Sequence, residues 1–154
     1  MRPNFGLKGT LAVAGAIMLT AGWGFSAETN KQTHDQIVVA ACQTLTTCKL
    51  FAFGGVGYAG TISDGEKAFH TVAASTNAVE LFRALLKQGT VEGKMYGLCG
   101  IRRLAPQSFK TEAEPVRTEK EVVATMSGCE RADERTAEVI TRIRSGSYDL
   151  YFAK

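Results

Sequence analysis

The sequence predicts a mainly α-helical fold: a small domain of about five short helices with one or two minor strands, stabilised by disulfides. Three observations lead to this prediction. Apolar residues recur at helical spacing in several segments, each bounded by capping residues or by glycine. The 154 residues have an ordinary globular composition, with 45% hydrophobic and 21% charged residues. Four cysteines follow an apolar N-terminal segment.

The first 26 residues have the pattern of a secretory signal peptide. Arg2 and Lys8 precede an uncharged run whose apolar centre is Leu11–Leu19. Small residues favour cleavage near Ser26, which leaves residues 27–154 as a single helical domain. An uncleaved membrane anchor is the alternative, although the run is short for the roughly 20 apolar residues of a spanning helix. We expect an exported protein, periplasmic or secreted, that meets a membrane only through this segment if it stays attached.

The charge pattern argues against a nucleic-acid partner. Loss of Arg2 and Lys8 with the signal peptide would leave 16 of the 18 basic residues against 15 acidic ones, a nearly neutral domain. Nucleic-acid binding needs cations gathered on one face. Lys110, Arg117 and Lys120 are instead interleaved with glutamates. We therefore expect another protein as the partner, and no nucleic acid.

The four cysteines predict two disulfides, because an even number in an exported chain is typical of a disulfide framework. They are Cys42, Cys48, Cys99 and Cys129. Bridging the first two requires the helix expected at residues 34–46 to end before Cys48, since six helical residues rise about 9 Å. We favour long-range pairing of each with Cys99 or Cys129. A reactive thiol at Cys129 and a zinc site are less favoured, because C-x-x-C is absent and the compartment is oxidising.

A glycine-rich turn follows the apolar run Phe51–Phe53, which has the character of a short strand. Gly55, Gly57 and Gly60 match the G-x-G-x-x-G pattern of dinucleotide-binding proteins, with Glu80 following 20 residues later. In such sites the helix begins inside the glycine pattern, so that its free N–H groups meet the pyrophosphate. Here the next helix starts several residues later, and few strands follow. We expect a tight turn and no cofactor.

Three short helices are expected after this turn. Ser63 and Glu66 have capping-box spacing and start the first. The second runs from about Asn77 to Gln88, with Gly89 as its stop. The third runs from about Val91 to Leu104. Successive helices joined by such tight turns pack antiparallel or at a steep angle.

The third of these helices has one face nearly without side chains. Gly93, Gly97 and Gly100 lie within about 60° of one another at 100° per residue. Each internal glycine costs up to about 1 kcal/mol relative to alanine, so the face needs a compensating contact. We favour a close helix crossing inside the domain, and a binding groove for a partner segment is the alternative.

The remaining chain reads as a linker followed by less regular elements. Residues 105–114, with Pro106, have the composition of a linker. Residues 116–126 suit either a helix or a strand. A helix is expected over 131–145, with acidic residues early and arginines late, as the helix dipole prefers. Alternation over 148–152 predicts a closing strand or an extended tail packed on the core.

Catalytic and metal-binding motifs are missing from the sequence. It contains no H-E-x-x-H, no G-x-S-x-G and no phosphate loop. His70, Asp64 and Glu66 are weak catalytic candidates, because Glu66 and His70 are four residues apart on one helical face. We favour a surface ion pair with a capping role for these residues. No catalytic, cofactor-binding or metal residue is expected.

These observations favour a protein-binding, inhibitor or immunity-type module, small, exported and disulfide-bonded. A small exported hydrolase with a site around His70, Asp64 and Glu66 is the first alternative. An envelope-anchored structural protein, held by an uncleaved N-terminal segment, is the second.

Overall fold

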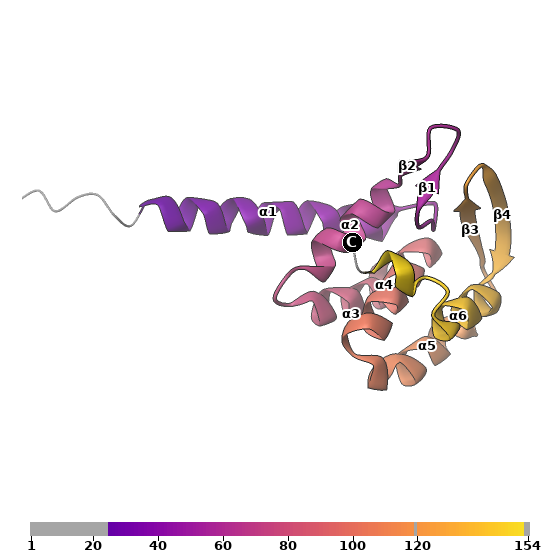
Figure 1. The fold of residues 1–154 in the computed structure, drawn as a ribbon. Helices are drawn as coiled ribbons and strands as arrows, with labels where there is room; N and C mark the ends of the chain where they lie inside the picture. The colour runs from indigo at the N-terminus through magenta and orange to yellow at the C-terminus, as the bar shows by residue number, and fades with distance from the viewer. Residues whose placement is uncertain (1–24, 119, 153–154) are drawn as a thin grey trace, which may run out of the picture.

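The computed structural model describes residues 25–118 and 120–152, and it is mainly helical, as the sequence predicts (Figure 1). The α-helices in this part of the chain are α1 (Phe25–Thr47), α2 (Asp64–Ala73), α3 (Ala78–Gln88), α4 (Val91–Leu104), α5 (Phe109–Arg117) and α6 (Thr136–Ser145). Two 3-10 turns, η1 (Pro106–Ser108) and η2 (Asp149–Tyr151), accompany them. The strands are β1 (Gly55–Val56), β2 (Thr61–Ile62), β3 (Val122–Ser127) and β4 (Glu130–Arg135).

Helix α4 lies at the centre of the fold, with the other helices around it (Figure 1). Every residue from Val91 to Ile101 is buried except Lys94. The glycines of this helix lie against neighbouring elements. A Cβ at Gly93 would come within 3.0 Å of the Leu45 carbonyl oxygen on α1, and one at Gly100 would overlap the ring of Phe82 on α3. The absence of side chains at these positions lets α1 and α3 approach α4 closely.

The expected helix starts are confirmed at α2 and α4. The Ser63 hydroxyl accepts a hydrogen bond from the Glu66 amide at 3.0 Å, and the Thr90 side chain accepts from the Gly93 amide at 3.2 Å. The second half of the capping box is different. The Glu66 carboxylate accepts from the amide of Gly54, in the loop before β1, at 2.6 Å. The Glu66 side chain therefore fixes the glycine-rich loop, and the cap of α2 is provided by Ser63 alone.

Two antiparallel hairpins lie side by side at one end of the molecule (Figure 1). β1 pairs with β2, and β3 pairs with β4 through the turn at Gly128, which has a φ of 57°. Isolated parallel bridges join Phe51 to Thr125 and Val56 to Gly128. The run Phe51–Phe53 is therefore a bridged extended segment beside β3 and not a regular strand.

Aromatic rings fill the space between α2, α4 and the C-terminal turn. Phe53 lies at the centre, with its ring centroid 5.2 Å from that of Phe69 and 5.3 Å from that of Tyr96. Most of these pairs meet edge to face, the arrangement that ring quadrupoles favour. The rings in contact with Phe53 are those of Phe51, Phe69, Tyr96, Tyr148, Tyr151 and Phe152.

The C-terminal third differs from the sequence prediction in three places. Residues 105–114 form η1 and most of α5, not a linker. The helix expected over 131–145 begins at Thr136, because residues 130–135 pair with β3 as β4. The expected closing strand is the 3-10 turn η2, which follows the left-handed Gly146.

The expected disulfides are not formed: all four cysteines, which lie within the described part of the chain, are free thiols. Their positions explain this. Cys99 is fully buried within α4, whereas Cys129 is exposed at the tip of the β3–β4 hairpin. Cys42 and Cys48 are half-buried near the end of α1. Because α1 ends at Thr47, Cys48 lies outside the helix, where its thiol donates to the Leu45 carbonyl at 3.2 Å.

The predicted signal peptide lies outside the described residues, apart from its last two positions, with which α1 begins. Helix α1 extends well beyond the expected start near residue 34, and its N-terminal part projects away from the other elements (Figure 1). Among the helices of the described segments, none has both the length and the apolar character needed to cross a membrane.

Candidate functional site: a groove between α1 and α3

The structure brings Glu66 and His70 together and leaves Asp64 apart. Oε1 of Glu66 lies 3.7 Å from Nε2 of His70, one helical turn away on α2. Asp64 is 86% exposed and pairs with Lys67 at 3.0 Å. A surface ion pair therefore exists at the start of α2, but it joins Asp64 to Lys67. The Glu66 side chain is only 1% exposed.

The contacts of Glu66 are those of a structural residue. One carboxylate oxygen accepts from the Gly54 amide, and the other faces His70. A general base must come within about 3 Å of the substrate proton that it removes. A carboxylate closed off from solvent and already bonded to the backbone does not offer such an approach. His70 Nε2 is itself buried and makes no hydrogen bond within the described residues.

The glycine pattern forms the β1–β2 hairpin. Gly57 and Gly60 have φ values of 71° and 60°, which explains why glycine occupies both positions. The Gly57 amide donates to the Gly128 carbonyl at 2.8 Å, and the Gly60 amide donates to the Gly57 carbonyl at 3.0 Å. Both amide groups therefore already donate hydrogen bonds within the protein. Helix α2 begins only at Asp64, after β2.

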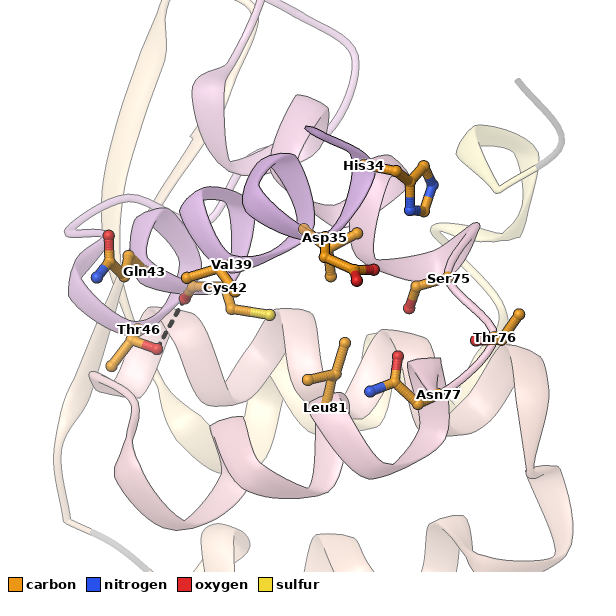
Figure 2. Close-up of a pocket in the computed structure, with 11 residues that line it drawn as sticks. His34, Asp35, Val39, Cys42, Gln43, Thr46, Ser75, Thr76, Asn77 and Leu81 are labelled. Atoms are coloured by element: carbon orange, nitrogen blue, oxygen red, sulfur yellow. Dashed lines mark hydrogen bonds between the residues drawn. The ribbon is translucent and has the colours of Figure 1, made fainter. Parts of the chain in front are cut away.

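A groove between α1 and α3 is the candidate site (Figure 2). Its volume is about 480 Å³, within the range of about 300–1,000 Å³ that is usual for ligand-binding pockets. One wall is α1, and the other is α3 with the turn between α2 and α3. The lining residues are His34, Asp35, Val38, Val39, Cys42, Gln43, Thr46, Ser75, Thr76, Asn77 and Leu81.

The middle of the groove is apolar. Figure 2 shows the Cys42 thiol on α1 and the Leu81 side chain on α3 both pointing into the space between the two helices. Val38 and Val39 add apolar surface from α1. Burial raises the pKa of the Cys42 thiol, so this sulfur is a neutral, weakly polar part of the surface at neutral pH. The middle of the groove therefore suits an apolar group.

Polar groups surround this apolar centre and remain available to a ligand. The side chains of Gln43, Thr76 and Asn77 line the groove and make no hydrogen bond within residues 32–118 and 120–152. Ser75 and Thr46 already donate to the carbonyls of Val72 and Cys42. Unused amide and hydroxyl groups beside an apolar surface can pair with the N–H and C=O groups of a bound polypeptide.

Charge is sparse in the groove. Asp35 is the one carboxylate among its lining residues, and His34 stands beside it. Both come from the N-terminal end of the α1 wall, where Figure 2 shows the Asp35 carboxylate facing the Ser75 side of the groove. Within the described residues, no group of three or more potential metal ligands is present. The groove is therefore suited to recognise a ligand through its shape and through hydrogen bonds.

The sequence did not identify this groove. Its two walls come from segments about 40 residues apart, and each wall reads as an ordinary helix face or turn. The available hint was the Ser75–Asn77 interruption between two helical patterns, which forms one end of the groove. Comparisons with models of known protein families, with curated proteins and with solved structures found no match.

Proposed function

We propose that the protein is an exported protein-binding module, of the inhibitor or immunity type, that binds a partner's polypeptide segment in the α1–α3 groove. The observation that carries this proposal is the combination of an apolar centre with unused amide and hydroxyl groups around it. An apolar side chain of the partner fits between Cys42 and Leu81, and its backbone pairs with Gln43, Thr76 and Asn77. The proposal does not depend on disulfides.

The energetics require a partner that also contacts the outer surface of α1. Burial of one large apolar side chain contributes about 1.5–3 kcal/mol, and each hydrogen bond about 0.5–1.5 kcal/mol net. A micromolar complex needs about 8 kcal/mol after the entropy cost of association. Ile37, which is 53% exposed on α1 and does not line the groove, offers additional apolar area, and Val39 in the groove lining is itself 58% exposed. A partner segment that fills the groove and covers these two side chains reaches useful affinity.

A peptide selection tests this proposal. Peptides are selected from a random displayed library against the full chain, and their affinities are measured by fluorescence polarisation. Val39→Asp places a charge in the groove at a half-exposed site, and Val122→Asp makes the same change at a site with 53% exposure on β3. We expect Val39→Asp to weaken binding by about tenfold or more, since a charge in an apolar contact costs more than 1.4 kcal/mol. Val122→Asp is expected to retain the affinity.

The Cys42 thiol provides a second readout of the same site. A peptide bound in the groove should slow alkylation of Cys42 and leave alkylation of the exposed Cys129 unchanged. Peptides that bind Val39→Asp as tightly as the unmodified protein, and leave Cys42 accessible, would place the binding elsewhere and refute the groove.

Export is tested separately by fractionation and intact mass. A mature protein that begins near residue 27 in the periplasm or the medium supports export with cleavage. A full-length chain in the membrane fraction supports the envelope-anchored alternative. The hydrolase alternative depends on the His70 region, where the buried Glu66 carboxylate offers it no support.

A further inference from the structure

A second groove lies between α5 and α6, at the opposite end of the chain from the α1–α3 groove. It has a volume of about 330 Å³. Its floor is apolar and consists of the buried side chains of Phe109, Ala113 and Ile140. Residues 109, 113 and 117 succeed one another along one face of α5 at intervals of four, and Ile140 and Arg144 do the same on α6.

The rim of this groove is cationic. Lys110 and Arg117 on α5 and Arg144 on α6 line it, together with a single carboxylate, Glu114. The formal charge of the lining is thus +2, whereas the α1–α3 groove contains one carboxylate and no lysine or arginine. The two grooves therefore suit ligands of different charge.

Only one of the three cations is neutralised by a local partner. The Arg117 guanidinium binds Glu114 through two nitrogen–oxygen contacts of 2.5 and 3.1 Å. This hydrogen bond, with smaller contributions from the charges of Arg144 and Lys110, lowers the pKa of the Glu114 carboxyl. Within the described residues, Lys110 and Arg144 make no hydrogen bond or salt bridge of their own. Two unpaired cations thus flank an apolar floor.

We propose that the α5–α6 groove binds an acidic segment of a partner protein. An apolar side chain of that segment rests on Phe109 and Ile140, and its carboxylates pair with Lys110 and Arg144. This inference goes beyond the proposed function, because the groove shares no lining residue with the α1–α3 groove.

A polypeptide fits this groove better than a phosphate-rich ligand does. Lys110 and Arg144 belong to different helices, so they suit carboxylates spaced along a chain. Nucleic-acid binding depends on many cations on one face, and this rim has three, one of them paired with Glu114.

The test uses three labelled twelve-residue peptides with free side chains, and the full-length protein. The first repeats Glu-Glu-Leu, the second repeats Glu-Glu-Ser, and the third repeats Lys-Lys-Leu. The variant Lys110→Glu/Arg144→Glu reverses the two unpaired charges. The matched control Lys49→Glu/Arg131→Glu changes the overall charge equally at two exposed residues outside the groove.

We expect the Glu-Glu-Leu peptide to bind, and binding to weaken by about tenfold or more in Lys110→Glu/Arg144→Glu. The control variant should stay within about twofold, since distant exposed charges are screened. Binding should weaken as NaCl rises from about 50 to about 200 mM. The Glu-Glu-Ser peptide should bind more weakly by about tenfold, because it lacks the apolar contact. Val39→Asp, which changes the α1–α3 groove, should leave the affinity for the Glu-Glu-Leu peptide unchanged.

Four outcomes would overturn the proposal. The first is that the Glu-Glu-Leu peptide does not bind, and the second is that the Glu-Glu-Ser or Lys-Lys-Leu peptide binds with the same affinity as it does. The third is that both double variants lose the same affinity for the Glu-Glu-Leu peptide. The fourth is that Lys110→Glu/Arg144→Glu keeps its affinity for that peptide. Vesicles of phosphatidylglycerol and phosphatidylcholine form a further arm. If they bind through Lys110 and Arg144 while the acidic peptide does not, the groove is a membrane contact and the protein partner is rejected.

Discussion

The hydroxyl of Tyr96 satisfies both backbone groups of Ala52. It donates to the Ala52 carbonyl at 2.7 Å and accepts from the Ala52 amide at 3.0 Å. Both residues are buried, with exposures of 0% and 2%. A single side chain from the central helix therefore performs the pairing that a neighbouring strand would provide, and it fixes the extended segment that precedes β1.

Tyr96→Phe is expected to destabilise the protein by about 2 kcal/mol, because it leaves the buried Ala52 amide without a partner. The Ala52 carbonyl loses one of its two hydrogen bonds and keeps the one from the Ser63 hydroxyl at 3.0 Å. The free energy of unfolding is measured by urea denaturation. Tyr58→Phe is the matched control, since the Tyr58 side chain is fully exposed at the tip of the β1–β2 hairpin. Equal stability of the two variants would contradict the structural role of the Tyr96 hydroxyl.

The glycines of α4 are expected to differ in their tolerance of alanine. At Gly93 the new Cβ meets the Leu45 backbone carbonyl, and at Gly100 it meets the fully buried ring of Phe82. Each change should cost about 2 kcal/mol, despite a helix-propensity gain of up to about 1 kcal/mol. At Gly97 the nearest atom, at 2.9 Å, belongs to the adaptable end of Leu86, and the Phe82 carbonyl oxygen lies at 3.1 Å. The net loss there should therefore be smaller, within about 1 kcal/mol.

Thermal and urea unfolding, with far-UV circular dichroism, measure this series. Equal losses at the three positions would show that the contacts of α4 do not determine tolerance. Increased helix content and stability in Gly100→Ala would show that the Phe82 ring moves aside at little cost.

The four thiols are expected to react with an alkylating reagent in the order Cys129, Cys42, Cys48 and Cys99. Cys129 is exposed. Burial raises the pKa of Cys42, raises that of Cys48 to about 11, and raises that of the fully buried Cys99 well above its usual value. Because the thiolate is the reactive form, these shifts slow alkylation. Mass spectrometry of timed samples gives the order, and a disulfide-linked peptide in a non-reducing digest would contradict the free thiols.

Stability should fall in acid through the ion pair of Glu134 and Arg142. Hydrogen bonds from Arg142 and then Thr125 lower the pKa of the Glu134 carboxyl, although its burial opposes the shift. A carboxyl whose pKa is lower in the folded state stabilises the protein above its unfolded pKa of about 4.5, and this contribution is lost as pH falls through the folded pKa.

Glu134→Gln is therefore expected to cost about 1 kcal/mol at pH 7, a modest value because Arg142 is partly exposed and its charge is screened by solvent. The cost should become progressively smaller as pH falls below about 4.5. Urea denaturation at several pH values measures the difference. The control is Glu138→Gln, which removes the partner of the 81% exposed Arg135, and a loss below about 0.5 kcal/mol is expected. A constant difference across the pH range would contradict the linkage.

Local capping chemistry made much of the helical part predictable. The side chains of Ser63 and Thr90 accept hydrogen bonds from backbone amides, as expected at helix starts. Helix α4 ends at Leu104 as expected, shortly before Pro106. By contrast, residues 130–135 are all charged except Ala132 and are mostly exposed, so they show no strand alternation. Their strand conformation comes from pairing with β3 across the Gly128 turn, a tertiary effect that overrides propensity.

The site was less predictable than the fold for a related reason. Glu66 was identified as half of a capping box, but its carboxylate binds the Gly54 amide, a partner that only the folded loop provides. The α1–α3 groove arises where two ordinary helices diverge, and no residue in it is unusual by itself. The cysteines suggested bridges by their even number, whereas in the structure all four are free and their burial differs, from the buried Cys99 to the exposed Cys129.

The extended segment at Phe51 joins sequence positions that are far apart. The Phe51 amide donates to the Ala124 carbonyl at 2.8 Å, and the Phe51 carbonyl accepts from the Met126 amide at 3.2 Å. The Gly57 amide likewise donates to the Gly128 carbonyl. A fragment that stops before β3 would leave these backbone groups unpaired, and one that begins after the hairpin would leave β3 without its neighbour. Shortened versions of the chain should therefore keep everything from the second half of α1 through η2, since α6 and η2 also supply buried core residues. Insertions belong at the exposed hairpin tips near Tyr58 and Cys129.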